Sequence, residues 1–219
     1  MFNIRSLTVG IVATNCYLVW NKATREGVLI DPGDEAERIC SAIAEERVNL
    51  KAILLTHGHF DHILVAEELK EKYDVPLYAS KEEKEMLENP QWNLSGMDEG
   101  VTITDYIPVQ DGDKLELLGK EWQVISTPGH TKGSVCYFVP GEIPYLFSGD
   151  TLFYESYGRT DLYGGSEAEI KKSIKEKLFC LPDETLVYPG HEEATTIANE
   201  KQYLSLIHIS EPTRRTPIS

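Results

Sequence analysis

The sequence predicts an α+β protein in which two β-sheets pack face to face and helices cover their outer faces. Each half of the chain runs through strand-like segments and then through helix-like segments, which suits such a sandwich, and no internal repeat is evident. At 219 residues, the chain forms one large domain or two small ones and can bury a sizeable core.

The first half opens with a pair of strands. Residues 16–20 and 27–31 are apolar runs joined by the polar segment 21–26, a pattern typical of a β-hairpin. An Asp-Pro-Gly break follows. We expect Asp34 to cap a helix that extends to about residue 46, because apolar residues recur there at helical spacing.

The rest of the first half continues this alternation. We predict a buried strand over residues 51–56, a helix over 63–72 and a short strand over 76–79. Residues 81–87 are expected to form a charged surface helix. Residues 89–110 lack clear periodicity, which is typical of a lid or a substrate-contacting loop and equally of a disordered segment.

The second half returns to strands, which are separated by turn residues. The strands are predicted at residues 114–118, 122–126, 134–139, 145–148 and 186–188. Helices are predicted over residues 166–178 and from about residue 194. The last fifteen residues, 205–219, carry two prolines and no helical periodicity, and they look like translated read-through. We therefore exclude them, with His208, and expect the folded domain to span residues 1–204.

Composition narrows the classes of partner. The net charge of −15 repels polyphosphate, so we expect neither nucleic acid nor an anionic membrane surface as a partner. The four cysteines are widely spread among apolar neighbours, which predicts buried free thiols. No run reaches the length of a transmembrane helix and the N-terminus lacks a secretory signal, so we expect a cytoplasmic protein. The oligomeric state is left open.

The segment Thr56-His57-Gly58-His59-Phe60-Asp61-His62 predicts a metal centre. Three histidines and an aspartate fall within it, directly after a buried strand, where polar side chains are costly unless something binds them. Imidazole and carboxylate are ligands that zinc, iron and manganese accept. Gly58 lets the backbone turn tightly enough to aim the neighbouring side chains at one point.

Three further candidate ligands stand beside glycines at strand ends. They are His130 in Pro128-Gly129-His130, Asp150 in Ser148-Gly149-Asp150 and His191 in Pro189-Gly190-His191. Together with those of the first segment they make seven potential ligands, which is enough for two metal ions. A bridging carboxylate would let the ions lie about 3.5–4 Å apart.

This set of motifs, in this order, resembles the metallo-β-lactamase fold superfamily over residues 1 to about 204. The resemblance implies a four-layer αββα sandwich of two mixed sheets, with the metal site at one sheet edge. It implies two divalent ions, with zinc expected and iron or manganese also accepted. The first ion would be held by His57, His59 and His130. The second would be held by Asp61, His62 and His191. Asp150 would bridge the two, and Asp61 and Asp150 would belong to the catalytic set.

Within the superfamily, residues 149–153 (Gly-Asp-Thr-Leu-Phe) and 158–162 (Gly-Arg-Thr-Asp-Leu) resemble the glyoxalase II branch, especially its short bacterial members. These are hydroxyacylglutathione hydrolases or related thioesterases. The resemblance therefore implies a small-molecule acyl-thiol substrate, cleaved by a metal-bridging hydroxide. A shared water has its pKa lowered from about 15.7 towards about 7. A thiolate, whose parent thiol has a pKa of about 8.5, needs little help from a general acid to leave. The amide nitrogen of a lactam would need protonation, so the site suits a thioester better than a lactam.

Arg159 is the candidate substrate-binding residue. Larger glyoxalase II enzymes place a basic residue near this position against glutathione, and an anionic thiol would give Arg159 a partner. A structural salt bridge to Asp161 in the same turn is an equally weighted alternative. Glu193 stands where the larger enzymes carry a substrate-contacting tyrosine, so the identity of the thiol is left open.

Three other functions are weighed against hydrolysis of a thioester. Persulfide dioxygenases also resemble this sequence and would use one iron held by His57, His130 and Asp150. A β-lactamase or lactonase is disfavoured, because zinc β-lactamases lack a carboxylate bridge at Asp150. A metal-binding module without catalysis would leave the solvent-filled position between the two ions without a role. Two ions per chain would favour hydrolysis, and one iron with oxygen uptake would favour oxidation.

Overall fold

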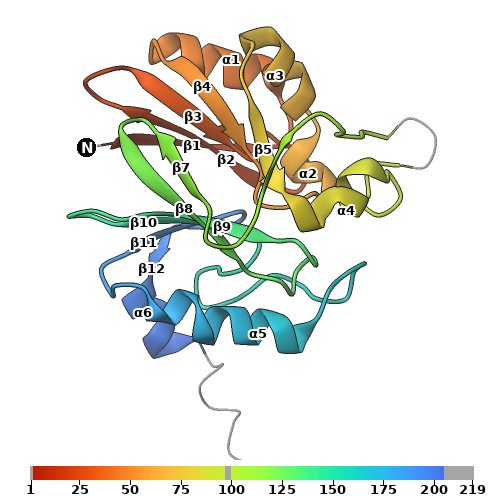
Figure 1. The fold of residues 1–219 in the computed structure, drawn as a ribbon, viewed down its shortest axis with the longest axis vertical. Helices are drawn as coiled ribbons and strands as arrows, with labels where there is room; N and C mark the ends of the chain where they lie inside the picture. The colour runs from red at the N-terminus through yellow and green to blue at the C-terminus, as the bar shows by residue number, and fades with distance from the viewer. Residues whose placement is uncertain (1, 97–99, 205–219) are drawn as a thin grey trace, which may run out of the picture.

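The computed structural model describes residues 2–96 and 100–204, which form a four-layer αββα sandwich (Figure 1). Two six-stranded sheets pack face to face, and helices cover the outer face of each sheet. The predicted fold class is therefore confirmed. The predicted read-through tail, residues 205–219, lies outside the described residues.

The first sheet contains the strands of the first half in sequence order. They are β1 (Phe2–Val9), β2 (Thr14–Asn21), β3 (Glu26–Ile30), β4 (Asn49–Leu54), β5 (Leu77–Ser80) and β6 (Ile107–Val109). The first three strands pair antiparallel, and β3 to β6 run parallel, so the sheet is mixed. Strand β6 was not predicted, since its three residues lie in the aperiodic segment 89–110.

The second sheet contains the strands of the second half in the order β12-β11-β10-β9-β8-β7. They are β7 (Lys114–Leu117), β8 (Lys120–Ser126), β9 (Val135–Val139), β10 (Tyr145–Gly149), β11 (Leu186–Pro189) and β12 (Thr195–Thr196). Strands β10 and β11 run parallel, whereas the other neighbours run antiparallel. The carboxyl ends of β10 and β11 therefore lie side by side.

Helices α1 and α3 cover the outer face of the first sheet and α5 and α6 that of the second, whereas α2 and α4 lie beside the end of the first sheet (Figure 1). Those of the first half are α1 (Ala36–Glu45), α2 (Phe60–Ile63), α3 (Ala66–Tyr73), η1 (Lys81–Glu83) and α4 (Lys84–Glu88). Those of the second half are α5 (Glu167–Glu176), η2 (Leu178–Cys180) and α6 (Ile197–Tyr203). None of these helices is long and apolar enough to cross a bilayer.

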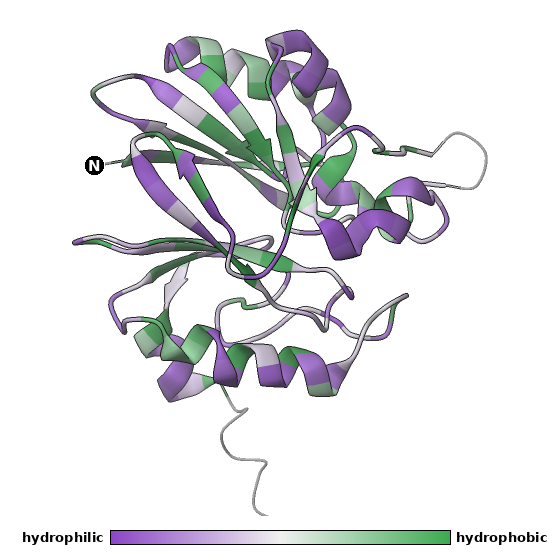
Figure 2. Ribbon diagram, in the orientation of Figure 1, coloured by the Kyte–Doolittle hydropathy of each residue, from purple (hydrophilic) through white to green (hydrophobic). Residues whose placement is uncertain are grey.

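The core has three apolar layers, one between the sheets and one beneath each helical layer. Neighbouring strand residues point to opposite faces of a sheet. Accordingly, Val28 and Phe147 lie in the layer between the sheets, whereas Leu29 and Leu146 face the helices. Strands β3 and β9, which are covered on both faces, are almost continuously hydrophobic (Figure 2).

The helix predicted over residues 63–72 is wrong as a single element, because the chain forms α2 and α3 with a break between them. The segment packs against the turn after β3: the Val65 amide donates to the Pro32 carbonyl (3.3 Å), and a Cβ on Gly33 would lie 1.5 Å from the Asp61 carbonyl oxygen. This tertiary contact interrupts the helix at a point where the apolar residues of the sequence still recur at helical spacing.

Two further expectations about helices are corrected. Asp34 does not cap α1, because the capping position is taken by Glu35, in the left-handed region (φ 56°), and Asp34 Oδ1 accepts from the Glu35 amide. Residues 81–87 form η1 and most of α4 in place of a single helix, and their charged residues 81, 82, 84 and 85 are exposed as predicted, but one side of the segment is buried. Glu83, Met86 and Leu87 are buried beneath the loops that follow β4 and β8.

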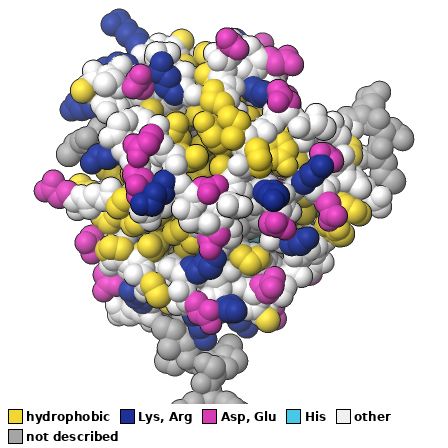
Figure 3. All heavy atoms as spheres, in the orientation of Figure 1, with side chains coloured by type: hydrophobic (Ala, Val, Ile, Leu, Met, Phe, Trp, Pro, Cys, Tyr) yellow, Lys and Arg dark blue, Asp and Glu magenta, His cyan; other side chains and the backbone are white. Residues whose placement is uncertain are grey.

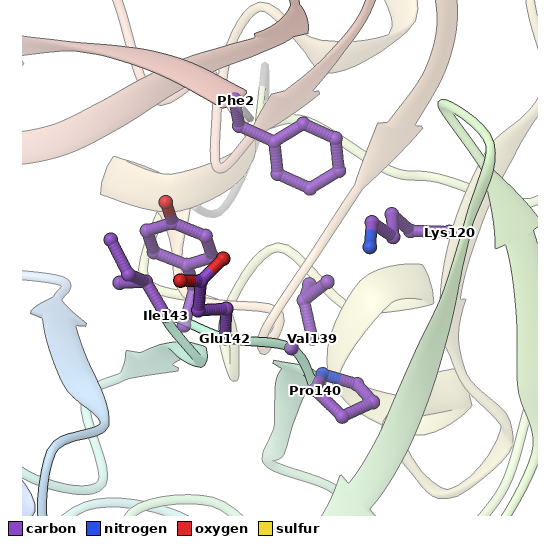
Figure 4. Close-up of a pocket in the computed structure, with 8 residues that line it drawn as sticks. Phe2, Lys120, Val139, Pro140, Glu142 and Ile143 are labelled. Carbon is purple, nitrogen blue, oxygen red and sulfur yellow. The ribbon is translucent and has the colours of Figure 1, made fainter.

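On one face of the molecule the acidic side chains are not segregated. On the face shown in Figure 3, acidic, basic and hydrophobic side chains are interspersed. A cavity of about 140 Å³ opens where β9 ends and β10 begins, and Figure 4 shows Phe2, Lys120 and Glu142 in its lining. It lies at the end of the second sheet opposite to the strand ends that carry the predicted ligands.

Candidate metal centre

The predicted ligands lie on four loops at one edge of the sandwich. The segment 57–62 follows β4, His130 lies between β8 and β9, Asp150 follows β10, and His191 follows β11. Backbone hydrogen bonds join the two sheets here. The Val135 amide donates to Thr56 (2.8 Å) and the Asn15 amide donates to Gly190 (2.7 Å). The loops of both halves therefore face one another.

The structure brings all seven predicted ligands together. Their ligand atoms form three overlapping groups, within each of which all atoms lie within 4.8 Å of one another. The groups are His57, His59 and His130; His57, His62 and Asp150; and Asp61, His62 and His191. The first and third groups have the same membership as the two ligand sets that the resemblance implied.

Asp150 lies between the first and third groups. Its Oδ2 atom is 3.4 Å from Nε2 of His130 and 3.5 Å from Nε2 of His191, and its Oδ1 atom is 3.4 Å from Nε2 of His62. Glycines make room for this carboxylate and its backbone. A Cβ on Gly190 would lie 2.2 Å from Asp150 Oδ1, and one on Gly158 would lie 2.0 Å from the Asp150 carbonyl oxygen.

The third group is held together by Asp61. Its Oδ2 atom is 3.4 Å from Nε2 of His62 and 3.3 Å from Nε2 of His191. The same oxygen accepts a hydrogen bond of 2.6 Å from the Thr14 hydroxyl at the start of β2. Thr14 therefore fixes the orientation of this carboxylate, a role that sequence reasoning missed.

The donor set fits a metal cation. Seven buried side-chain polar atoms in the described residues lack a hydrogen-bond partner, and four of them lie in this cluster. These four are Nε2 of His57, His59 and His62, and Oδ1 of Asp150. On His59 the other ring nitrogen, Nδ1, faces the cluster, 2.9 Å from Nε2 of His130. Buried polar atoms without a partner are costly, so the three that face one another on His57, His62 and Asp150 indicate a bound group. Imidazole nitrogen and carboxylate oxygen are ligands that a divalent cation accepts.

The charges around the cluster favour a cation at its centre. Burial and then the neighbouring imidazoles lower the pKa of His57, and burial chiefly lowers that of His59 to about 3, so both rings are neutral ligands at pH 7. Burial would raise the pKa of Asp150, but His62 and the neighbouring histidines outweigh it and lower that pKa to about 2. Asp150 is therefore ionised.

The protonation of His62 shows the same preference. Burial alone would lower its pKa, but Asp61, Asp150 and Asp31 raise it well above the usual value. Three carboxylates therefore favour positive charge at this position, whether the charge is a proton on the ring or a cation beside it.

Asp31, at the end of β3, orients this part of the site and was not predicted. Its Oδ1 atom accepts from the Thr56 amide (2.8 Å), and its Oδ2 atom accepts from the Thr56 hydroxyl (2.6 Å) and lies 2.9 Å from Nδ1 of His62. The ring of His62 therefore points its Nε2 atom at the cluster. In the sequence Asp31 precedes Pro32-Gly33 and was interpreted as part of a turn.

Arg159 contributes to the site in two ways. Its carbonyl oxygen lies 2.8 Å from Nδ1 of His130, and since a carbonyl only accepts, Nδ1 donates and Nε2 faces Asp150. Its guanidinium donates to both carboxylate oxygens of Asp161, at 2.7 and 2.8 Å. The salt bridge weighed as an alternative is thus present, and Arg159 also borders the pocket above the cluster.

That pocket has a volume of about 320 Å³. Besides Arg159 and the predicted ligands, its described lining is apolar, with Val12, Phe60, Leu94, Phe153 and Leu162. Leu94 comes from the segment 89–110, whose Asn93 carbonyl accepts from the Phe60 amide (2.7 Å). This part of the aperiodic segment therefore borders the candidate site.

The sandwich and the His/Asp cluster at its edge define a metallo-hydrolase. The family model described as the metallo-beta-lactamase superfamily matches residues 9–191, and the chain belongs to that superfamily. It is 38% identical over 201 residues to a probable metallo-hydrolase, YqgX of Bacillus subtilis, covering 90% of this chain and 93% of that protein. It is 35% identical over 206 residues to the hydroxyacylglutathione hydrolase GloC of Haemophilus influenzae, covering 91% and 95%.

Solved structures share the fold. BLEG-1, a B3 metallo-beta-lactamase, is 36% identical with a TM-score of 0.85, over 94% of this chain and all of that one. TTHA1623 in a di-iron-bound form is 35% identical with a TM-score of 0.80, over 91% and 98%. ETHE1 from Myxococcus xanthus is 32% identical with a TM-score of 0.75, over 92% and 83%. The likeness therefore extends over nearly the whole described chain.

Proposed function

We propose that this protein is a binuclear metal-dependent hydrolase that cleaves a small-molecule thioester, like a hydroxyacylglutathione hydrolase. The observation that supports this best is the position of Asp150, whose two oxygens face histidines of both ligand sets. A carboxylate so placed suits a pair of ions that share it. The similarity to GloC supports the thioester as substrate, and the similarity to TTHA1623 in its di-iron-bound form supports two ions.

In this proposal His57, His59 and His130 would hold one ion, Asp61, His62 and His191 would hold the other, and Asp150 would lie between them. The ions would supply a nucleophilic water at neutral pH and polarise the carbonyl of the substrate. Asp31, Thr14 and the Arg159 carbonyl orient the ligands, as their hydrogen bonds show. Zinc is the proposed metal, with iron and manganese as alternatives.

The pocket lining favours a leaving group that departs without a proton. Beyond the five predicted ligands that line the pocket, Arg159 is the one polar residue among the described lining residues. A guanidinium, with a pKa above about 12, does not protonate an amide nitrogen. A thiolate needs no such donor. The apolar residues Val12, Leu94 and Phe153 would contact the acyl group and exclude water from it.

The likeness to ETHE1 favours a second candidate function, oxidation of a persulfide by a single iron on the same fold. That reaction would use His57, His130 and Asp150 as ligands. The complete third group of Asp61, His62 and His191 argues for a second ion instead, because their ligand atoms already converge. Because the chain is similar to BLEG-1, the experiment below also measures hydrolysis of a β-lactam.

The test combines metal content with a substrate panel. Protein purified without added metal is analysed for zinc, iron and manganese, and is then stripped and reloaded with each metal in turn. Each form is offered acyl-glutathione, acyl-cysteamine, a β-lactam, and glutathione persulfide in an oxygen electrode. We expect two ions per chain and thioesterase activity that is lost on chelation and restored by metal. A metal-loaded protein inert to every acyl-thiol would contradict the proposal, and one iron with oxygen uptake would favour the second candidate.

A further inference from the structure

Glu83 is a buried carboxylate that has no part in the ligand set. It ends the short helix η1, immediately before α4, and only 2% of the residue is exposed. Burial raises the pKa of its carboxyl group, and hydrogen bonds from Thr131, Gly133 and Gly58 oppose that shift. Carboxylates are rarely buried unless they are fully paired, so the position calls for an explanation.

Each oxygen of Glu83 serves a different ligand-bearing loop. Its Oε2 atom accepts from the amide of Gly58, which lies between His57 and His59 (2.9 Å). Its Oε1 atom accepts from the hydroxyl of Thr131, the residue after His130, and from the amide of Gly133 (2.8 Å). One carboxylate thus joins the loop after β4 in the first sheet to the loop before β9 in the second.

Two glycines allow the loops to come this close, which is an independent sign of the same contact. A Cβ on Gly58 would lie 2.8 Å from Met86 Cγ and 3.0 Å from Glu83 Oε2. A Cβ on Gly133 would lie 2.5 Å from the backbone nitrogen of Glu83 and 2.8 Å from Glu83 Oε1. Both loops therefore pack on the start of α4 through positions where a side chain does not fit.

We propose that Glu83 is a positioning residue for the metal centre: it fixes the loop of His57 and His59 relative to the loop of His130. These three histidines form the first ligand group, and they are the group whose members come from both sheets through the loops that Glu83 binds. A carboxylate suits this task because its two oxygens accept from both loops at once, whereas an amide has one acceptor oxygen and would meet the second loop with an N–H group.

The test compares Glu83→Gln with a matched control, Glu200→Gln. Glu200 is also fully buried, and it also divides its oxygens: Oε1 accepts from Thr195 and Asn199, and Oε2 accepts from the Glu155 amide. None of these partners lies within three residues of a predicted ligand. Both variants replace a buried carboxyl group by an amide and disturb a comparable set of hydrogen bonds, but only one disturbs the ligand loops.

Zinc affinity is measured on the full chain by competition with a chromophoric chelator, after circular dichroism shows that each metal-free variant is folded. The visible spectrum of the cobalt-loaded protein reports the geometry of the site. We expect Glu83→Gln to weaken zinc binding by about 10- to 100-fold and to alter the cobalt spectrum. Glu200→Gln should stay within about threefold of the parent chain, although both variants unfold at a lower temperature.

Equal zinc affinity of Glu83→Gln and the parent chain would overturn the inference, and so would an equal loss in Glu200→Gln. If Glu83→Gln does not fold, Thr131→Val decides, because it removes one donor to Oε1 and keeps the side-chain shape. A several-fold loss of zinc affinity is expected there, and an unchanged affinity would refute the role of Glu83.

The inference rests on the metal site of the proposed function but not on the thioester. Zinc bound normally by Glu83→Gln, with thioesterase activity intact, would reject the inference alone. Normal zinc binding by the parent chain, with no activity on any acyl-thiol, would reject the thioesterase proposal and leave the positioning role standing. A parent chain that binds no metal would overturn both.

Discussion

At the scale of single residues, the proposed pair of ions depends most on Asp150. Its carboxylate faces His130 of the first ligand group and His62 and His191 of the third, and 10% of its side chain is exposed. No other carboxylate among the described residues lies within 3.5 Å of ligand atoms of both groups. Loss of its charge therefore affects both positions at once.

We predict that Asp150→Asn lowers the metal content from two ions per chain to one or fewer and lowers hydrolysis by more than about 100-fold, because an amide does not bridge two cations. Elemental analysis and thioesterase assays measure both effects. Asp183→Asn is the control, since Asp183 is an exposed carboxylate paired with Lys201. An Asp150→Asn protein that retains two tightly bound ions would refute the bridging role.

Arg159 either contacts the substrate or forms only a surface salt bridge with Asp161, and substitution of Arg159 separates these two roles. Its side chain is 60% exposed, so its pair with Asp161 contributes little to stability. If it binds an anionic thiol, Arg159→Ala raises KM for an acyl-glutathione by about fivefold and leaves kcat unchanged, because the lost contact is the same in the ground and transition states. KM for a neutral acyl-cysteamine stays unchanged.

The matched variant Asp161→Asn removes the intramolecular partner and leaves the guanidinium in place. It should lower KM for the anionic thioester or leave it unaltered. If Arg159→Ala changes neither KM, the pair with Asp161 is purely structural.

Predictability from the sequence differed between residues for a physical reason. Three histidines and an aspartate in one short segment are so costly to bury unbound that their composition alone indicates a metal site. Asp31 and Glu83 carry no such signal. The first resembles a turn residue before Pro-Gly, and the second lies within Lys81-Glu82-Glu83-Lys84-Glu85, a pattern typical of a solvated helix. Only the arrival of loops from elsewhere in the chain buries them.

At the scale of elements, the loop before His130 depends on contact with α5. Gly129 has φ +138°, and a Cβ there would lie 2.2 Å from the backbone nitrogen of Ile170. The Ser166 amide at the start of α5 donates to the Gly129 carbonyl (2.8 Å). The first turn of α5 therefore supports the loop that carries His130.

We predict that Gly129→Ala destabilises the metal-free protein by about 3 kcal/mol, since overpacking against α5 adds to the backbone strain. Gly112→Ala is the control. Gly112 also has a positive φ (+84°), but a Cβ there meets nothing within 4 Å, so about 1 kcal/mol is expected. Urea unfolding gives both values. Equal losses would show that strain alone matters at Gly129 and that the loop does not depend on its contact with α5.

The strands were largely predictable because burial on both faces leaves continuous apolar runs such as residues 52–55. The exceptions are short edge elements. Strands β6 and β12 have three and two residues, too few to show any periodicity. The break between α2 and α3 was also unpredictable, since it is imposed by the distant Pro32-Gly33 turn and not by local propensity.

At the scale of the whole molecule, the candidate metal centre links the two halves of the sandwich. The segment 57–62 belongs to the first sheet, whereas His130, Asp150 and His191 belong to the second. The apolar layer between the sheets holds the halves together along their length. At the ligand edge, however, the unpartnered nitrogens and the carboxylates oppose closure until a cation is present.

Metal removal is therefore expected to lower stability as well as activity. An ion that binds only the folded chain stabilises it by about 4 kcal/mol when its free concentration is 1,000 times its Kd. For a domain of this size, that corresponds to a fall on the order of 10 °C in Tm on chelation. Calorimetry of the parent chain with and without chelator measures it. His62→Ala, which removes a ligand of the third group, should show a smaller difference between the two conditions. A parent chain with the same Tm in both would mean that the apolar layers alone hold the halves together and that the cluster closes without a cation.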